Sequence, residues 1–197
     1  MIKALIFDYN GVLTNHGDFE SFLAEKAKNT SRDAREIQQI VRQYWDLAKV
    51  GAIDSELIWV HVAGYFHCEA QELRREWLSW FKLRQDLLLL ITKLKNKYKT
   101  ALLTNITRDW FEQVRKEQNL EAYFEVIVSS YEAKAAKPDP EIFEYTLQKL
   151  GLKADECIFI DDQEKNTSAA FKIGFKVILF ESVKKLKVQL MEYGVMV

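Results

Sequence analysis

Short apolar runs alternate with helical stretches over residues 1–13 and again from residue 87 onwards. The runs are rich in Val, Ile and Phe and are bounded by polar residues, which is typical of strands buried on both faces. Five segments have this pattern: Ala4–Phe7, Ala101–Leu103, Val126–Val128, Ile158–Ile160 and Val177–Phe180. Helical spacing marks the segments Leu87–Leu94, Trp110–Gln118, Glu141–Leu150 and Asn166–Ile173. This alternation predicts an α/β fold with a doubly wound, mainly parallel sheet.

Residues 14–86 follow a different pattern, with no convincing strand and with apolar positions at helical spacing. We predict four amphipathic helices that form a bundle inserted after the first strand. Their apolar stripes are Phe19/Phe22/Leu23, Ile37/Ile40/Val41/Tyr44/Trp45/Ala48, Leu57/Ile58/His61/Val62/Tyr65 and Leu73/Trp77/Trp80/Phe81. Most of the Trp residues lie in this insert, and we interpret them mainly as bundle core. An insert that emerges beside the first strand can also cover a site there, so one or two Trp side chains could face a substrate.

Composition narrows the class of protein. The chain has 197 residues, 48% of them apolar, with 28 Lys and Arg against 29 Asp and Glu. A near-zero net charge argues against nucleic-acid and polybasic membrane binding. The sequence shows no signal-peptide pattern, no apolar stretch of the ~18 residues that a membrane span needs, and no disulfide framework. We therefore predict a cytoplasmic protein that binds neither nucleic acid nor membrane, with a homodimer as an open possibility.

Residues suited to phosphate or metal chemistry follow four of the predicted strands. They are Asp8, the pair Thr104-Asn105, Lys137, and the pair Asp161-Asp162. Taken singly, each is more often a turn former, a helix cap or a surface residue. Ligand sites of open α/β sheets lie outside the carboxyl ends of the strands, so four such positions in succession predict one shared site.

These positions resemble the motifs of the haloacid dehalogenase (HAD) superfamily, whose hydrolases use an aspartate nucleophile. The stretch "FDYNGVL" is similar to the first motif except at its second Asp, where Asn10 stands. The resemblance covers essentially the whole chain and implies a Rossmann-like core at 1–13 and 87–197, with a helical cap of the C1 type at 14–86. The chain resembles most the phosphatase branch that includes sugar-phosphate phosphatases and the N-terminal phosphatase domain of epoxide hydrolases.

The resemblance implies a role for each motif residue. Asp8 would attack phosphorus and form an aspartyl-phosphate. Mg²⁺ would be held by Asp8, Asp162, the backbone carbonyl of Asn10, and Asp161 directly or through water. Thr104, Asn105 and Lys137 would bind the phosphoryl oxygens. The expected substrate is a small phosphorylated metabolite, and Asn166 is expected to tie together the loop of the fourth motif.

Asn10 departs from the motif at a catalytic position. The usual Asp serves as general acid and then as general base, whereas an amide has no titratable proton. Loss of such a group typically costs a factor of ~10²–10⁴ in rate. Fold, metal site and phosphate binding should survive, because Asn and Asp are nearly isosteric.

Several explanations of Asn10 stay open. It could be an introduced substitution, or belong to a protein that binds a phosphorylated ligand without turnover. It could suit acyl phosphates, whose leaving group needs no proton, or carbon–halogen cleavage as in haloacid dehalogenases. The last is disfavoured, because those enzymes need no Mg²⁺ and the pair Asp161-Asp162 suggests a cation. Deamidation at Asn10-Gly11 could also restore a carboxylate, and His16 could partly substitute as an acid.

Overall fold

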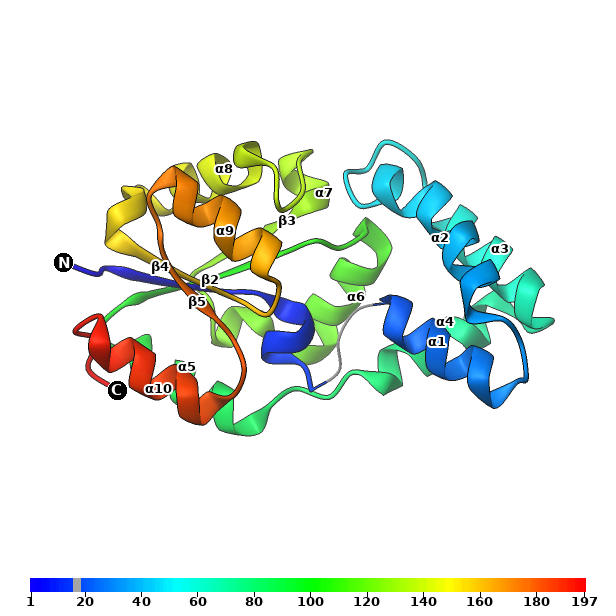
Figure 1. The fold of residues 1–197 in the computed structure, drawn as a ribbon, viewed down its shortest axis with the longest axis horizontal. Coiled ribbons are helices and arrows are strands. Elements are labelled where there is room, and N and C mark those ends of the chain that lie inside the picture. The colour runs from blue at the N-terminus through cyan, green and yellow to red at the C-terminus, as the bar shows by residue number, and fades with distance from the viewer. Residues whose placement is uncertain (16–18) are drawn as a thin grey trace.

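The computed structural model describes residues 1–15 and 19–197, and its centre is one parallel sheet of five strands. The strands are β1 (Ala4–Phe7), β2 (Lys99–Thr104), β3 (Val126–Ser129), β4 (Cys157–Asp161) and β5 (Lys176–Leu179). Their spatial order is β3-β2-β1-β4-β5, with β1 in the middle (Figure 1). The predicted α/β fold with a parallel, Rossmann-like sheet is confirmed.

Helices cover both faces of this sheet and bury its side chains in two apolar clusters. Leu5, Phe7 and their neighbours join the cluster with α5 (Gln85–Leu94), α6 (Arg108–Gln118) and α10 (Val183–Glu192). Ala4, Ile6 and their neighbours face α7 (Ser130–Ala133), α8 (Pro140–Leu150) and α9 (Glu164–Ile173). Successive residues of a strand point to opposite faces, and both faces are covered, which explains why β1 is apolar at every position and why the middles of the other strands are apolar.

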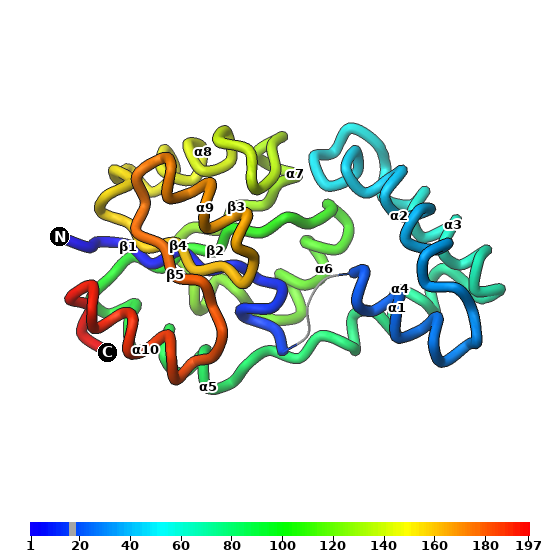
Figure 2. The backbone as a smooth tube through the Cα atoms, in the orientation of Figure 1, coloured from blue at the N-terminus to red at the C-terminus, as the bar shows by residue number. Residues whose placement is uncertain are grey.

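Four helices of the inserted segment lie beyond one end of the sheet, past the carboxyl ends of the strands (Figure 2). They are α1 (Phe19–Asn29), α2 (Ala34–Ala48), α3 (Glu56–Phe66) and α4 (Ala70–Trp80). Each packs against the next along the chain. The apolar cluster under α5, α6 and α10 continues without a break into this insert. The division into a core at 1–13 and 87–197 and a cap at 14–86 stays a prediction.

The third predicted stripe is wrong in part. In α3 the buried side chains are Ile58, Trp59, Val62, Ala63 and Phe66. Leu57 and His61 are exposed, because the buried face of α3 is rotated by about one position from the stripe that the sequence suggested. The His61 ring instead stacks on Tyr44 from α2, with ring centroids 4.6 Å apart.

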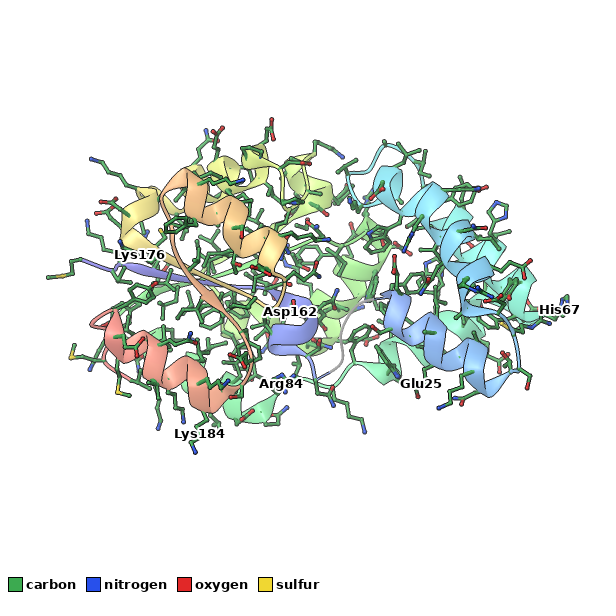
Figure 3. All side chains as sticks on the ribbon, viewed as in Figure 1. Glu25, His67, Arg84, Asp162, Lys176 and Lys184 are labelled. Carbon is green, nitrogen blue, oxygen red and sulfur yellow. The ribbon has the colours of Figure 1, made fainter. Side chains whose placement is uncertain are left out.

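His67 is exposed at the far tip of the insert, away from Asp162 (Figure 3). His16 lies outside the described residues. No helix in the two described ranges combines the length and the apolar character that crossing a bilayer would require.

The corrected buried face of α3 can be tested with two valines of the same helix. Val62 is fully buried, whereas Val60 is 53% exposed. Val62→Ala removes packed methyl groups and should lower the free energy of unfolding by roughly 1–3 kcal/mol. Val60→Ala should change it by less than about 0.5 kcal/mol. Equilibrium urea unfolding of both variants measures the difference, and equal losses would contradict this orientation of α3.

Candidate active site

Asp8 stands at the carboxyl end of the central strand β1, where the backbone turns sharply. Its N–H donates to the carbonyl of Ile160 at 2.9 Å, which extends the β1–β4 pairing by one bond. A wide helical turn, Tyr9–Leu13, follows and is closed by the Thr14 N–H donating to the Tyr9 carbonyl at 3.0 Å. The turn brings residues 8–13 over the end of β4.

Gly11 lets this turn approach Asp162 closely. Its φ of +77° lies in the left-handed region, and a β-carbon there would stand 2.1 Å from Oδ2 of Asp162. Any side chain at residue 11 would therefore collide with a carboxylate of the site. Sequence reasoning did not anticipate this contact, although a Gly shortly after a strand end is the signal that could have suggested it.

Lys137 is the electrostatic centre of the site. Its Nζ lies 2.7 Å from Oδ1 of Asp8 and 2.7 Å from Oδ2 of Asp161. All three side chains are almost fully buried, at 3%, 4% and 0% exposure of the residue. Breaking such a buried ion pair by removing one partner is costly, because the remaining charge is left uncompensated.

Asn105 fixes the backbone of Lys137. Its side-chain amide donates to the Lys137 carbonyl at 2.8 Å and accepts from the Lys137 N–H at 2.8 Å. Both polar atoms of Asn105 are thus engaged in positioning the lysine, and a direct contact of this amide with phosphate stays a prediction.

Asp161 is held by donors on all sides. Its Oδ1 accepts from the Gln163 N–H at 2.8 Å and from Asn166 Nδ2 at 3.0 Å. Its Oδ2 accepts from Lys137 and from the same Asn166 nitrogen at 3.1 Å. The predicted tie between Asn166 and the loop after β4 is therefore present in the structure.

Thr104 ends strand β2 and is 1% exposed. Among the described residues its Oγ1 has no hydrogen-bond partner. A buried hydroxyl without a partner is costly, so it points to a group that completes its hydrogen bonding. Asn10 has a similar feature, because its Oδ1 is buried and also lacks a partner among the described residues.

Three carboxylates could hold a divalent cation. Asp8, Asp161 and Asp162 each offer one oxygen, and the three oxygens lie within 4.8 Å of one another. Oxygen ligands of this kind suit hard cations such as Mg²⁺. Because the donors around Asp161 already occupy both of its oxygens, Asp8 and Asp162 fit direct coordination better, with Asp161 bound through water. The residues present therefore fit a cation.

Burial and charge set the protonation of the site. Burial raises the pKa of Asp8 well above the ordinary value of 3.8; Lys137 opposes this rise, and Asp161 and Asp162 add to it. Burial acts to lower the pKa of Lys137, but Asp161 and Asp8 outweigh it, so that pKa is raised. These shifts favour the ammonium form of Lys137, and a further positive charge beside Asp8 would favour its carboxylate form.

A cavity of about 320 Å³ opens beside Asp8. Core residues form one side of it, including Asn10, Asn105 and Lys137. The insert forms the other side, with Phe19, Glu20, Val41, Arg42, Trp45, Asp46 and Lys49. The volume lies at the small end of the range for ligand pockets. One Trp of the insert, Trp45, thus faces the cavity, as the sequence suggested for one or two of them.

A family model for haloacid dehalogenase-like hydrolases matches residues 2–174. This match covers most of the chain, so the chain belongs to that family. The recognition made from the motifs is confirmed at this level.

One solved structure and two curated relatives illustrate the similarity. A HAD family enzyme from Bacteroides thetaiotaomicron, in complex with magnesium and inorganic phosphate, has a TM-score of 0.77 and 27% identity, covering 94% of this chain and 99% of that one. Glyceraldehyde 3-phosphate phosphatase of Methanocaldococcus jannaschii is 24% identical, covering 88% of this chain and 82% of that protein. Flavin mononucleotide hydrolase 1 of Arabidopsis thaliana is 33% identical over 86 residues, 44% of this chain. This chain spans only 35% of the plant protein's length.

The raised pKa of Asp8 predicts a pH-dependent stability that divalent cations remove. The folded chain favours the neutral form of Asp8, so this contribution is complete below pH 3.8 and is lost as the pH rises towards about 8. Without divalent cations, the free energy of unfolding should fall over this interval relative to Asp8→Asn, by at least about 1.4 kcal/mol. Urea unfolding at several pH values, with EDTA or with Mg²⁺, measures it; parallel curves for the two chains in EDTA would contradict it.

Proposed function

We propose that the chain is a Mg²⁺-dependent hydrolase of a small phosphomonoester that acts through an aspartyl-phosphate on Asp8. The observation that carries the proposal is the buried group in which Lys137 joins Asp8 to Asp161. At the end of the neighbouring strand β2, the hydroxyl of Thr104 has no partner among the described residues. The magnesium and phosphate in the complex of the Bacteroides enzyme support this interpretation of the carboxylate cluster. When bound, Mg²⁺ would neutralise negative charge between Asp8 and the substrate phosphate.

In the first step, a carboxylate oxygen of Asp8 attacks phosphorus, and the bond from phosphorus to the leaving oxygen breaks. Lys137 and Thr104 hold the phosphoryl oxygens while charge shifts among them. The leaving alkoxide must take up a proton. In the second step, water attacks the aspartyl-phosphate and releases inorganic phosphate, which restores Asp8.

Asn10 decides how well these steps proceed. Its amide can neither protonate an alkoxide nor deprotonate the attacking water. Asn10 lines the cavity with Asp8, so the expected place of the acid–base group is occupied by an amide. Turnover should therefore depend strongly on the leaving group, with acyl phosphates favoured over alkyl phosphates.

A second function is favoured by the same position. The buried Oδ1 of Asn10 and the buried hydroxyl of Thr104 both lack partners among the described residues, so both await a ligand. A protein that binds a phosphorylated ligand without hydrolysing it would keep all these contacts. By contrast, three carboxylates whose oxygens lie within 4.8 Å of one another favour a cation, and so do not favour a haloacid dehalogenase.

The relatives bear on the substrate class. The cavity volume of about 320 Å³ suits a small metabolite. The archaeal relative is named for glyceraldehyde 3-phosphate and the plant relative for flavin mononucleotide, which are both phosphomonoesters. We propose that the substrate of the present chain belongs to the same class.

Restoring the carboxylate at residue 10 tests the proposed function. Asn10→Asp should raise kcat for an alkyl phosphomonoester by about 10²–10⁴, because it supplies the missing proton transfer. The gain should be smaller for p-nitrophenyl phosphate, whose leaving group needs little protonation. Steady-state kinetics with Mg²⁺ measures both gains.

Asp8→Asn in the same background is the control and should abolish turnover. Intact mass must show that Asn10 has not deamidated in the unsubstituted chain. Absence of hydrolysis by both the unsubstituted chain and a well-folded Asn10→Asp variant would eliminate the hydrolase and leave the binding protein.

Replacing the unpartnered hydroxyl of Thr104 separates phosphate binding from stability. Thr104→Val should leave the free energy of unfolding unchanged or raise it by about 1 kcal/mol, because it removes an unsatisfied buried group. Inhibition by inorganic phosphate should weaken by roughly tenfold or more, as one hydrogen bond to a charged ligand is lost.

Thr146 offers a matched control, since it is buried and its hydroxyl donates to the Ile142 carbonyl at 2.7 Å. Thr146→Val should lose about 1 kcal/mol of stability with phosphate inhibition unchanged. If phosphate inhibition were unchanged in Thr104→Val, or weakened equally in Thr146→Val, a role for Thr104 in phosphate binding would be contradicted.

A further inference from the structure

The first turn of α6 joins the core to the insert through the carboxylate of Asp109. Its Oδ2 accepts from the indole N–H of Trp59 at 3.1 Å, and its Oδ1 accepts from the hydroxyl of Ser55. Trp59 lies in α3, and Ser55 is the residue directly before the first residue of that helix. Both are almost fully buried, at 4% and 6% exposure. The hydroxyl of Thr107 donates to the same Oδ1 at 2.9 Å and comes from the core.

The next residue, Trp110, contacts the other three helices of the insert. Its ring centroid lies 3.9 Å from that of Trp77 in α4, 6.1 Å from Phe19 in α1, and 6.4 Å from Trp45 in α2. Two consecutive residues of one core helix thus contact each of the four helices described in the insert. In Figure 1, α6 lies where the sheet layer meets the insert.

These contacts connect directly to the cavity. Helix α6 begins four residues after Thr104, whereas Phe19 and Trp45 line the cavity on the insert side. A second tie supports the arrangement: Ser130 donates to the Lys49 carbonyl at 2.7 Å and accepts from the Ile106 N–H at 3.0 Å. Residues 104–110 therefore link the end of strand β2 to the helices of the insert that line the cavity.

A helix-capping role does not account for Asp109. An acidic residue in the first turn of a helix is favoured by the helix dipole alone. The partners of Asp109 in the insert, however, are 50 and 54 residues away in the sequence. A buried indole N–H and a buried hydroxyl would lose their acceptor if Asp109 were removed.

We propose that Asp109 is a positioning residue, whose hydrogen bonds to Ser55 and Trp59 fix the insert wall over Asp8. The proposal rests on the proposed hydrolase function. It assigns the leaving group to the insert wall and the transferred phosphoryl group to the core. Loss of Asp109 then impairs substrates that reach the wall and spares those that occupy the core alone.

Three variants test this in the Asn10→Asp background: Asp109→Ala, Asp109→Asn and Asp86→Ala. The amide that Asp109→Asn introduces can accept from Trp59 and donate to the hydroxyl oxygens of Ser55 and Thr107, so this variant should keep the function. Asp86 is the matched control, because it is an acidic residue in the first turn of core helix α5 that accepts from a backbone N–H.

We expect Asp109→Ala to lower kcat/KM for a sugar phosphate by about 10–100-fold, the scale of a misplaced binding wall. Hydrolysis of acetyl phosphate and inhibition by inorganic phosphate should change less than about twofold, since the core supplies those contacts. Asp109→Asn and Asp86→Ala should behave like the parent. Equal losses for both substrates, or equal losses in Asp109→Asn and Asp109→Ala, would overturn the proposal.

Hydrogen–deuterium exchange gives a readout that needs no activity. In Asp109→Ala, amides of α3 should exchange about tenfold faster or more, with α8 and α9 unchanged. Unchanged exchange in α3, or faster exchange throughout the chain, would overturn the positioning role. If no variant hydrolyses any phosphate ester, the hydrolase function fails, and exchange still decides whether Asp109 holds the insert.

Discussion

The ion pairs of Lys137 with Asp8 and Asp161 are the interaction on which the rest of the site depends. An ammonium buried to this degree is tolerated only with close carboxylates and full hydrogen bonding. Together with Asp162, three carboxylates stand against one ammonium. The two remaining negative charges equal in size the charge of a divalent cation. A carboxylate in place of Asn10 would add a third, so with the amide the site would be balanced once a divalent cation is bound, as the proposed function requires.

Three uncharged residues hold the cluster of Lys137 and the carboxylates in place. Asn105 clamps the backbone of Lys137, Asn166 bridges both oxygens of Asp161, and Gly11 leaves room for Asp162. None of the three carries a charge. They fix the orientation of charged groups before a ligand arrives, which is how a site stabilises charge at low reorganisation cost. The insert adds the remaining wall, so both parts of the fold contribute to one cavity.

The sheet and the cluster at its edge could be predicted from sequence because both follow strict rules. Apolar runs of a parallel sheet are continuous, and functional residues gather at the strand ends, so Asp8 and Asp161 were found by position. Lys137 was found by its order in the motifs, although α7 separates it from the end of β3. Helix orientation in the insert was harder. In α3 almost every position is apolar, so no stripe stands out, and His61 was assigned to the wrong face. The contacts of Asp109 with the insert could not be predicted, because its partners Ser55 and Trp59 are distant in sequence. The helix dipole alone also explains an acidic residue in the first turn of a helix.

The turn at Tyr9–Leu13 has a consequence for how such a site changes over generations. Its shape comes from backbone hydrogen bonding, from Gly11 and from the side chains of Asp8 and Thr14, and no described hydrogen bond of the Asn10 side chain closes it. The codons for Asn and Asp differ by a single base. One nucleotide change therefore separates the present amide from a carboxylate, with no rearrangement of the loop. Under the proposed chemistry, a lineage could pass between holding a phosphorylated metabolite and consuming it by the smallest step that mutation provides.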